Sequence, residues 1–369
     1  MEDRLKYIDL FAGAGGFSQG IKYANAEVAL GVDNWGIAAK NYRNNFENIF
    51  LQENIGSVSN IVSLISDYDF DVIVGGPPCQ DFSSAGKGVE GERANLTLEF
   101  SKIVSILKPK YFIMENVPNA RKSNSYQKAK KNFLEGGYGV TETILDANYY
   151  GVPQRRKRLF LIGALNQPDF DISENFEMRQ TIFPLTVKEY MPDISLTDYY
   201  LHPRSYERRG VFSVYEPSPT IRGVNRPKPK TYVQHIGNTN KDDEVVSLSY
   251  DLRSRIQTFP KEYHWVGNIS EIEQMIGNAV PPLLAKAVVE TISNHSKKEP
   301  YVGEEYEFYK FLQKQKGLTK DEYKSTIKEL RKSYRYLRNK NRSTSQSQLI
   351  KSIGLENTIV NDYLEFKGN

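Results

Sequence analysis

The stretch KYIDLFAGAGGFSQG, residues 6–20, decides the fold class of the chain. An apolar run typical of a buried strand leads directly into Gly13, Gly15 and Gly16, and a helical pattern follows at once. Glycines permit a tight turn and a close approach of the backbone to a ligand. The turn alone is a weak signal, because Ser18 stands where the dinucleotide fingerprint G-x-G-x-x-G has its third glycine.

An acidic residue stands where a nucleoside would need one. Asp33 ends the second apolar run, about twenty residues after the glycines, where a carboxylate can accept hydrogen bonds from ribose hydroxyls. The same features also fit a glycine turn and a strand-end carboxylate in another kind of α/β enzyme. We favour a nucleoside-bearing ligand and leave the alternative open.

Short apolar runs alternate with amphipathic stretches as far as residue 165. The alternation predicts an α/β fold with a mostly parallel sheet and helices on both faces. Ligands of such sheets bind beyond the carboxyl ends of the strands. The apolar runs are KYIDLFA (6–12), EVALGVD (27–33), IFLQENI (49–55), DVIVGG (71–76), KYFIMENV (110–117), VTETILDA (140–147) and RLFLIGA (158–164).

The remaining chain divides by composition. Residues 166–246 are rich in Pro, Arg, Tyr and Asn and predict a small irregular domain. Residues 247–296 end in a helical pattern that we expect to pack back on the sheet and complete the domain of residues 1–165. Residues 297–369 are helical in pattern, with sixteen Lys and Arg against ten Asp and Glu, as in a polyanion-binding appendage.

The bulk composition excludes several classes of protein. The chain has 369 residues, one cysteine and a net charge of +4. One cysteine rules out an internal disulfide framework and a zinc site built from several cysteines. No apolar run approaches the roughly 18 residues of a membrane span, and the N-terminus lacks a signal-peptide pattern, so we expect a cytoplasmic protein without membrane contact.

The single cysteine stands at a special place. Cys79 lies in DVIVGGPPCQDFSSAG, residues 71–86, after the apolar run and past the Pro77-Pro78 pair. An isolated cysteine is most often a small buried hydrophobe, but such a residue should lie within the run. At the ligand end of a strand, past prolines that fix the backbone, the thiol is positioned for nucleophilic attack.

Partner groups for this thiol end the following strands. Glu115 and Asn116 end the run FIMENV, and neighbouring parallel strands would bring them close to Cys79. Glu115 could equally be a structural cap at a strand end. The segment PQRRKRLFLIG places four basic residues, 155–158, before another run, where they are either a solvated edge or a site for negative charge.

The ordered motifs resemble those of the DNA cytosine-5 methyltransferase family, the type found in bacterial restriction-modification systems. The matches cover residues 5–165 and 247–295, and six ordered matches are hard to obtain by chance. The resemblance implies an S-adenosylmethionine-dependent methyltransferase fold with a Rossmann-like sheet, a target recognition domain at 166–246 and a C-terminal helical extension outside the family core. The matching pieces are DLFAGAGGFSQG, VDNW, GGPPCQDFSSAG, ENV, QRRKRLFLIG and QMIGNAVPP.

The resemblance also implies a chemistry. Cys79 would attack cytosine C6, and Glu115 would protonate or hydrogen-bond N3, so that C5 becomes an enamine-like carbon able to take a methyl group. S-adenosylmethionine would supply that methyl group and leave as S-adenosylhomocysteine, and no metal is required. Arg156 and Arg158 match the family's basic positions near the target base.

In family terms, Phe11 stacks on adenine, the glycine turn approaches the methionine part, Asp33 holds the ribose and Asn54 faces the adenine edge. Asn34 departs from the family, since many members have a bulky aromatic residue there, and Trp35 follows it. Asp251 and Leu252 replace a usual Arg-Glu pair, although Arg255 is kept. The implied cofactor residues are Phe11, Ala12, Gly13, Gly15, Gly16, Asp33, Asn34, Asn54, Pro77 and Asn278.

A cytosine stacked in a duplex must swing out to reach such a pocket. We expect the polar loop 80–96 to close over it. The segment 204–230 has seven basic residues against two acidic ones, and its arginines are either base readers and phosphate contacts or a solvated basic loop. The implied DNA contacts are Gln80, Ser83, Arg93, Arg208, Arg209, Thr220, Arg222 and Arg226.

The leading interpretation is a modification enzyme that methylates cytosine within a short sequence of double-stranded DNA. It would act as a monomer, with a cognate restriction endonuclease as a possible companion in the same system. An RNA cytosine-5 methyltransferase acting on tRNA, a catalytically inactive DNA-binding relative and a dinucleotide-dependent oxidoreductase are the alternatives. The Cys79 and Glu115 pair argues against the inactive relative, and the basic segments argue against the oxidoreductase.

Overall fold

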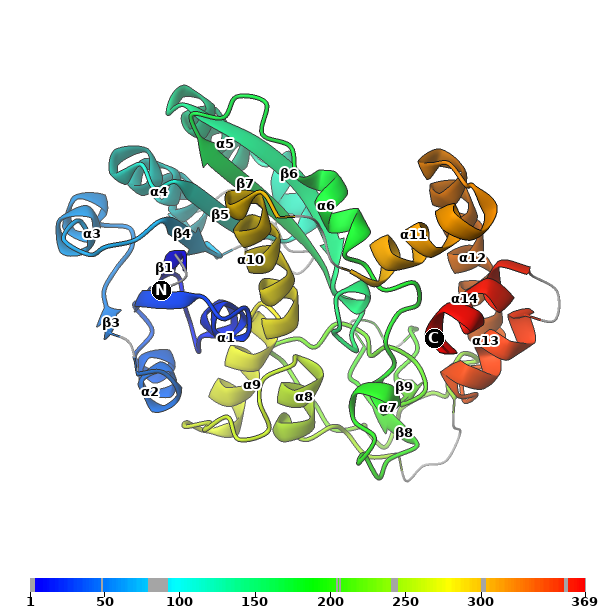
Figure 1. Cartoon of the computed structure of the whole chain (residues 1–369). Helices are drawn as coiled ribbons and strands as arrows, with labels where there is room; N and C mark the ends of the chain where they lie inside the picture. The colour runs from blue at the N-terminus through cyan, green and yellow to red at the C-terminus, as the bar shows by residue number, and fades with distance from the viewer. Residues whose placement is uncertain are drawn as a thin grey trace.

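A seven-stranded sheet forms the centre of the part of the chain that the structure describes. The computed structural model describes residues 4–47, 49–78, 92–203, 205, 207–239, 245–299, 303–354 and 358–368. The strand order is β3-β2-β1-β4-β5-β7-β6 (Figure 1). The strands are β1 (Lys6–Leu10), β2 (Glu27–Asp33), β3 (Ile49–Gln52), β4 (Val72–Gly75), β5 (Tyr111–Asn116), β6 (Tyr138–Asp146) and β7 (Lys157–Leu165).

Strands β1 to β5 run parallel, whereas β7 inserts antiparallel between β5 and β6. Each of the seven apolar runs of the sequence contributes one strand, so the predicted fold class is confirmed. The chain leaves β1 towards β2 on one side and later returns to place β4 on the other side. This reversal between β1 and β4 is the switch point at which open α/β sheets bind ligands.

Helices cover both faces of the sheet because alternate strand residues point to opposite sides. On β1, Tyr7 joins one apolar core with α1 (Gly16–Tyr23) and α10 (Pro282–Lys297). Its neighbour Ile8 joins a second core on the opposite face. The helices of that second core are α3 (Val58–Ile65), α4 (Glu92–Leu107) and α5 (Asn124–Glu135).

Helices α1 and α10 approach closely because α1 carries a glycine at their contact. A Cβ at Gly20 would collide with Ala285 of α10. The contact brings α10, late in the chain, against the helix that follows the glycine turn (Figure 1). Helix α10 therefore packs against a helix that lies within residues 1–165.

The irregular segment after the sheet contains α6 (Ser173–Met178), α7 (Val187–Tyr190) and the antiparallel strands β8 (Asp198–Tyr200) and β9 (Val211–Ser213). Apolar residues of α7, of β8 and of the stretch after β9 share a core with α8 (Tyr250–Ile256), α9 (Ile269–Asn278) and α2 (Gly36–Asn45). This part of the irregular segment is therefore packed against α2, α8 and α9.

The C-terminal extension consists of α11 (Glu304–Lys316), α12 (Lys320–Lys340), α13 (Gln346–Gly354) and α14 (Thr358–Gly368). Helix α12 buries a stripe at helical spacing, Tyr323, Ile327, Leu330 and Tyr334, in a core that also takes in Phe183. Figure 1 shows these helices beside the irregular segment that holds α7, β8 and β9. None of the helices described is long and apolar enough to cross a membrane.

Candidate active site

A cavity of about 420 Å³ opens beyond the carboxyl ends of the strands around the β1/β4 switch point. Its size lies within the range of small-molecule sites. It extends from the glycine turn, at one end, to Glu115 and Arg158. Of the ten predicted cofactor residues, all except Gly15 line it, namely Phe11, Ala12, Gly13, Gly16, Asp33, Asn34, Asn54, Pro77 and Asn278.

Asp33 holds the glycine turn in place. Its carboxylate accepts hydrogen bonds from the N–H groups of Gly13 and Trp35, each at 2.9 Å. Burial raises the pKa of Asp33 above its ordinary value, and these hydrogen bonds oppose the rise. The turn requires a glycine at position 15. The φ of Gly15 is 85°, and a Cβ there would collide with the ring of Phe46.

Phe11 enters the cavity from a backbone conformation with φ 60°, which side-chain-bearing residues rarely adopt. Such conformations cost of the order of 1–3 kcal/mol and cluster at ligand sites. Asn34 and Trp35 both line the cavity, so the aromatic residue next to Asn34 also faces the ligand space.

Sequence reasoning missed Asp9, a buried carboxylate that also lines the cavity. It accepts hydrogen bonds from the N–H of Ser18 at 3.1 Å and from its hydroxyl at 2.6 Å. Burial raises the pKa of Asp9 to about 7, although the bonds from Ser18 oppose the rise. An acidic residue in the middle of an apolar strand, in KYIDLFA, was the available signal.

Glu115 lies at the opposite end of the cavity, 8% exposed. Its Oε1 is 2.7 Å from Nε of Arg158, on the antiparallel strand β7. A Cβ at Gly76 would lie 3.1 Å from Oε2, so a glycine there leaves the carboxylate its space. Burial raises the pKa of Glu115 above its ordinary value, against the opposing charges of Arg158 and Arg156.

The parallel pairing of β4 and β5 brings the segment before Cys79 to Glu115, as expected from the sequence. Asn116 reinforces this approach, since its Nδ2 donates to the carbonyl of Pro77 at 3.3 Å. Cys79 itself lies outside the described residues, as do Gln80, Ser83 and the side chain of Arg93. The last described residue before Cys79 is Pro78, which lines the cavity.

Arg156 is buried, and its side chain connects segments that are distant in the sequence. It donates to the carbonyl oxygens of Ile221 and Gly277 at 2.9 Å and of Ala279 at 3.0 Å. These contacts join the residue before β7 to the irregular segment at Ile221 and to the end of α9. Arg158 lines the cavity, whereas the described lining does not include Arg156, so this geometry favours a positioning role for Arg156.

Gln154 is a second buried connector that sequence reasoning missed. Its Nε2 donates to Gln257 at 2.8 Å, and its Oε1 accepts from the N–H of Ile221 at 2.9 Å. A glutamine beside the basic run carries no local signal of burial, so only the tertiary structure reveals its role.

The proposed DNA contacts differ in how free their side chains are. Arg208 and Arg226 are exposed. Arg209 forms an ion pair with buried Glu216 and lies 4.4 Å from the Phe212 ring centre, which favours a bracing role. Arg222 donates to the carbonyl of His202, and Thr220 donates to the carbonyl of Arg155 at 2.8 Å.

Comparison with known proteins matches residues 5–294 to the family model described as C-5 cytosine-specific DNA methylase. Type II methyltransferase M.HgiDI of Herpetosiphon aurantiacus is 49% identical over 287 residues, covering 76% of this chain and 92% of that relative. Type II methyltransferase M.HindV of Haemophilus influenzae is 45% identical over 302 residues, covering 79% and 98%. The solved structure of Entamoeba histolytica methyltransferase EhMeth shares the fold, with a TM-score of 0.63 at 17% identity, covering 80% and 99%.

Proposed function

The chain belongs to the C-5 cytosine-specific DNA methylase family, and on that premise we propose that it methylates C5 of a cytosine flipped out of a specific short duplex sequence. The observation that carries the proposal is the cavity that joins the Asp33 turn to the Glu115–Arg158 pair. It offers a nucleoside site at one end and, at the other, an acid beside the segment leading to Cys79.

The residues around the turn fit S-adenosylmethionine. Asp33 presents a carboxylate where ribose hydroxyls would lie, Phe11 presents an aromatic face and Asn54 an amide. Gly13 and Gly16 line the cavity beside the turn, where the methionine part would lie. When bound, this cofactor supplies an electrophilic methyl group on a sulfonium.

The residues at the other end fit the activation of cytosine. The Cys79 thiolate would form a bond to C6 while Glu115 delivers a proton to N3, which shifts the ring electrons to C5. C5 would then take the methyl group, and the proton on N3 would return to the Glu115 carboxylate. Loss of the C5 proton as the C6–S bond breaks would expel the thiolate and restore the neutral aromatic ring. The raised pKa of Glu115 supports a role as proton donor, and Arg158 fixes the orientation of its carboxyl group.

The proposed domains follow the predicted boundaries: catalytic at 1–165 and 247–296, target recognition at 166–246 and extension at 297–369. The relatives are Type II methyltransferases, which supports a companion endonuclease for the same sequence. Extruding the target base costs a few kcal/mol, and phosphate contacts from the exposed arginines would offset it. The proposed closing loop, 80–96, lies largely outside the described residues.

The test supplies the protein with tritiated S-adenosylmethionine and either duplex DNA or tRNA. We expect label in DNA alone, and label in tRNA with none in DNA would favour the RNA alternative. A duplex carrying 5-fluorocytosine at the methylated site should become covalently attached, and mass spectrometry should locate the bond at Cys79. Cys79→Ser should bind the cofactor without forming the bond, and a covalent complex in that variant would remove Cys79 from the mechanism.

A further inference from the structure

The first half of α12, in the C-terminal extension, contacts α6 and the residues that follow β6. Lys324 of α12 forms an ion pair with Glu177 of α6 at 2.7 Å. Arg331 of the same helix donates to the carbonyl of Thr181 at 2.7 Å and lies 4.6 Å from the ring centre of Tyr149. These contacts fix the helix relative to the sheet, because Tyr149 ends the short 3-10 turn that directly follows β6.

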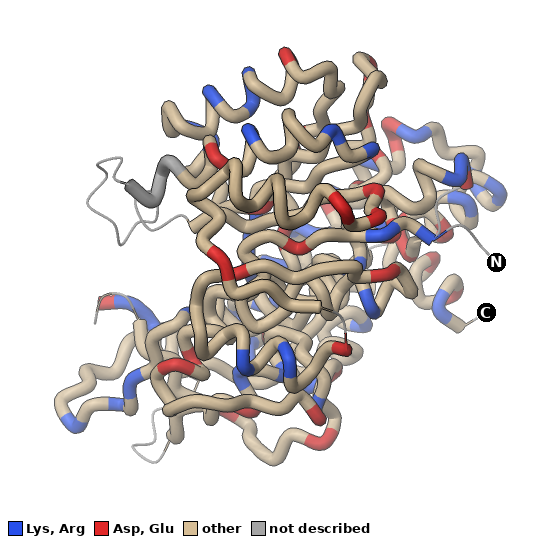
Figure 2. Tube along the Cα trace, turned by 90° about the vertical axis from the view of Figure 1, so that its left-hand side faces the viewer, with Lys and Arg blue, Asp and Glu red and all other residues tan. Residues whose placement is uncertain are grey.

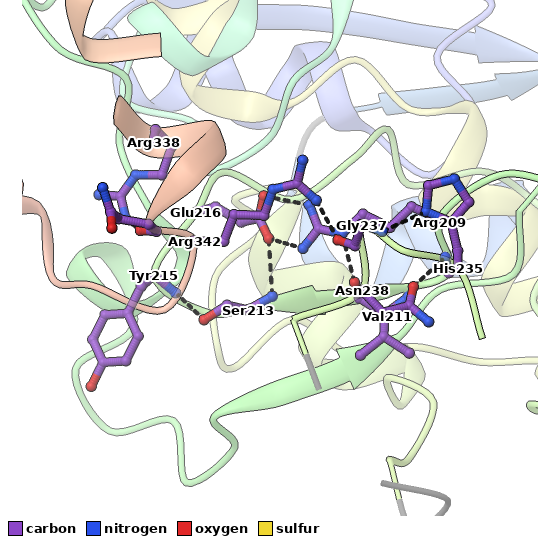
Figure 3. Close-up of polar contacts among 12 residues, drawn as sticks. Arg209, Val211, Ser213, Tyr215, Glu216, His235, Gly237, Asn238, Arg338 and Arg342 are labelled. Atoms are coloured by element: carbon purple, nitrogen blue, oxygen red, sulfur yellow. Dashed lines mark hydrogen bonds and ion pairs between the residues drawn. The ribbon is translucent and has the colours of Figure 1, made fainter. Parts of the chain in front are cut away.

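The other end of the extension reaches the recognition region. Arg342, just after α12, donates through Nη1 to the carbonyl of Gly237, 105 positions earlier in the chain (Figure 3). A Cβ at Gly237 would lie 2.9 Å from that Nη1, so the glycine allows the guanidinium to approach. The family match ends at residue 294, before the extension.

Gly237 belongs to a loop, residues 231–238, that we call the reading loop. Asn238 ties its base to β9, since its Oδ1 accepts from the N–H of Val211 at 3.2 Å and from the hydroxyl of Tyr232 at 3.1 Å. The N–H of Gly237 donates to Nδ1 of His235 at 2.9 Å (Figure 3). The loop backbone is therefore held from both sides, by β9 and by Arg342.

The reading loop presents apolar side chains to solvent. Val233 is 75% exposed and Ile236 is 99% exposed. Single exposed apolar residues are common, but these two stand on a braced loop that follows Arg226, Lys228 and Lys230. Basic residues hold phosphates, and methyl-bearing side chains contact the thymine methyl group in the major groove. The combination fits duplex DNA better than a protein surface.

We propose that the reading loop contacts a base pair through Ile236 and that Arg342 is the positioning residue by which the extension holds this loop. The inference rests on the proposed function and adds to it a specificity element. The extension then contributes to DNA recognition indirectly, by fixing the loop, rather than by contributing positive charge to the DNA surface.

The experiment first identifies the recognition sequence by sequencing the methylated cytosines of DNA exposed to the enzyme. Steady-state rates then give KM for that duplex and for duplexes with one base pair changed. We expect Ile236→Ser to raise KM at least tenfold and to weaken discrimination at one position, since the variant loses an apolar contact that only the matching base pair provides. Ile269→Ser, a change at an isoleucine 65% exposed on α9, is the matched control and should leave KM unchanged.

Arg342→Gln should raise KM for DNA about fivefold or more while leaving the cofactor affinity unchanged. In the double variant the two effects should not add, because both act through one loop. Arg335→Gln, at an exposed arginine of α12, controls for lost charge. If Arg342→Gln lowers stability too far, Gly237→Ala tests the same contact by crowding the guanidinium.

Unchanged KM and discrimination in Ile236→Ser would overturn the reading role. Equal effects of Arg335→Gln and Arg342→Gln, or additive effects in the double variant, would overturn the positioning role. These failures are separate from failure of the proposed function, in which the unaltered protein would transfer no methyl group to DNA.

Discussion

Glu115 and Asp9 are both buried carboxylates in the cavity, yet their surroundings differ. Glu115 is paired with a guanidinium, whereas Asp9 accepts hydrogen bonds only from Ser18 among the described contacts. The first arrangement fixes the orientation of a carboxyl group that lines the cavity, and the second anchors the start of α1. A substitution at either residue therefore tests the consequence of its raised pKa.

Replacing Glu115 should separate chemistry from binding. We expect Glu115→Gln to lower kcat by at least about 10²-fold, because the amide keeps the shape but cannot deliver a proton. Equilibrium binding of S-adenosylmethionine should stay within about twofold, since Asp33 and Phe11 lie at the other end of the cavity. A kcat near that of the unaltered enzyme would contradict the proton-donor role.

The raised pKa of Asp9 makes a prediction about stability. Its folded-state value of about 7 exceeds the ordinary value of 3.8, so the folded state binds the extra proton between these pH values. The free energy of unfolding should therefore fall as pH rises from about 4 to about 7, by at most about 4 kcal/mol from this residue. Asp9→Asn should remove that part of the fall.

Urea unfolding of both proteins at several pH values provides the measurement. As pH rises from about 4 to about 7, the free energy of unfolding should fall less in Asp9→Asn than in the unaltered protein. Parallel curves would show that the burial of Asp9 does not govern this pH range. Asp33 and Glu115 also have raised pKa values, so some pH dependence should remain in the variant.

At the scale of elements, the loop before β7 is joined to two others through Arg156. Arg156→Ala should leave the carbonyls of Ile221, Gly277 and Ala279 without this donor. We expect the free energy of unfolding to fall by roughly 3 kcal/mol. Urea unfolding measures the loss. Arg155→Ala, at the exposed neighbour, is the control and should change stability by less than about 0.5 kcal/mol. Equal effects of the two substitutions would contradict this account.

The elements themselves were predictable because their signals are local. The seven apolar runs have the length and composition of strands, and each forms one. The parallel neighbours β4 and β5 were also expected, and they bring Pro77 beside Asn116. The antiparallel insertion of β7 was not specified, because pairing direction depends on how the chain returns and not on the run itself.

At the scale of the whole molecule, Phe183 connects the C-terminal extension to the irregular segment that follows β7. Its ring centre lies 4.9 Å from that of Tyr334 on α12 and 5.0 Å from that of Tyr363 on α14. Phe183→Ala should lower the free energy of unfolding of the extension by about 3–5 kcal/mol. Limited proteolysis should then cleave residues 303–368 faster, while cofactor binding persists.

The matched control is Tyr336→Ala, which removes an aromatic side chain 59% exposed on α12. It should leave the rate of proteolysis unchanged. Equal protection of residues 303–368 in Phe183→Ala and the unaltered protein would show that the extension is held by its polar contacts alone, Arg331 and Arg342 among them.

The sequence by itself determined the strand and helix pattern and the glycine turn after β1, because these depend on neighbours within a few positions, and its ordered motifs indicated the family. Only the tertiary structure decided which partners individual side chains contact. Arg156 meets carbonyls 65, 121 and 123 positions away, and Arg342 meets one 105 positions away. An arginine looks the same in sequence whether it faces DNA or a carbonyl, and only long-range packing brings the carbonyl to it.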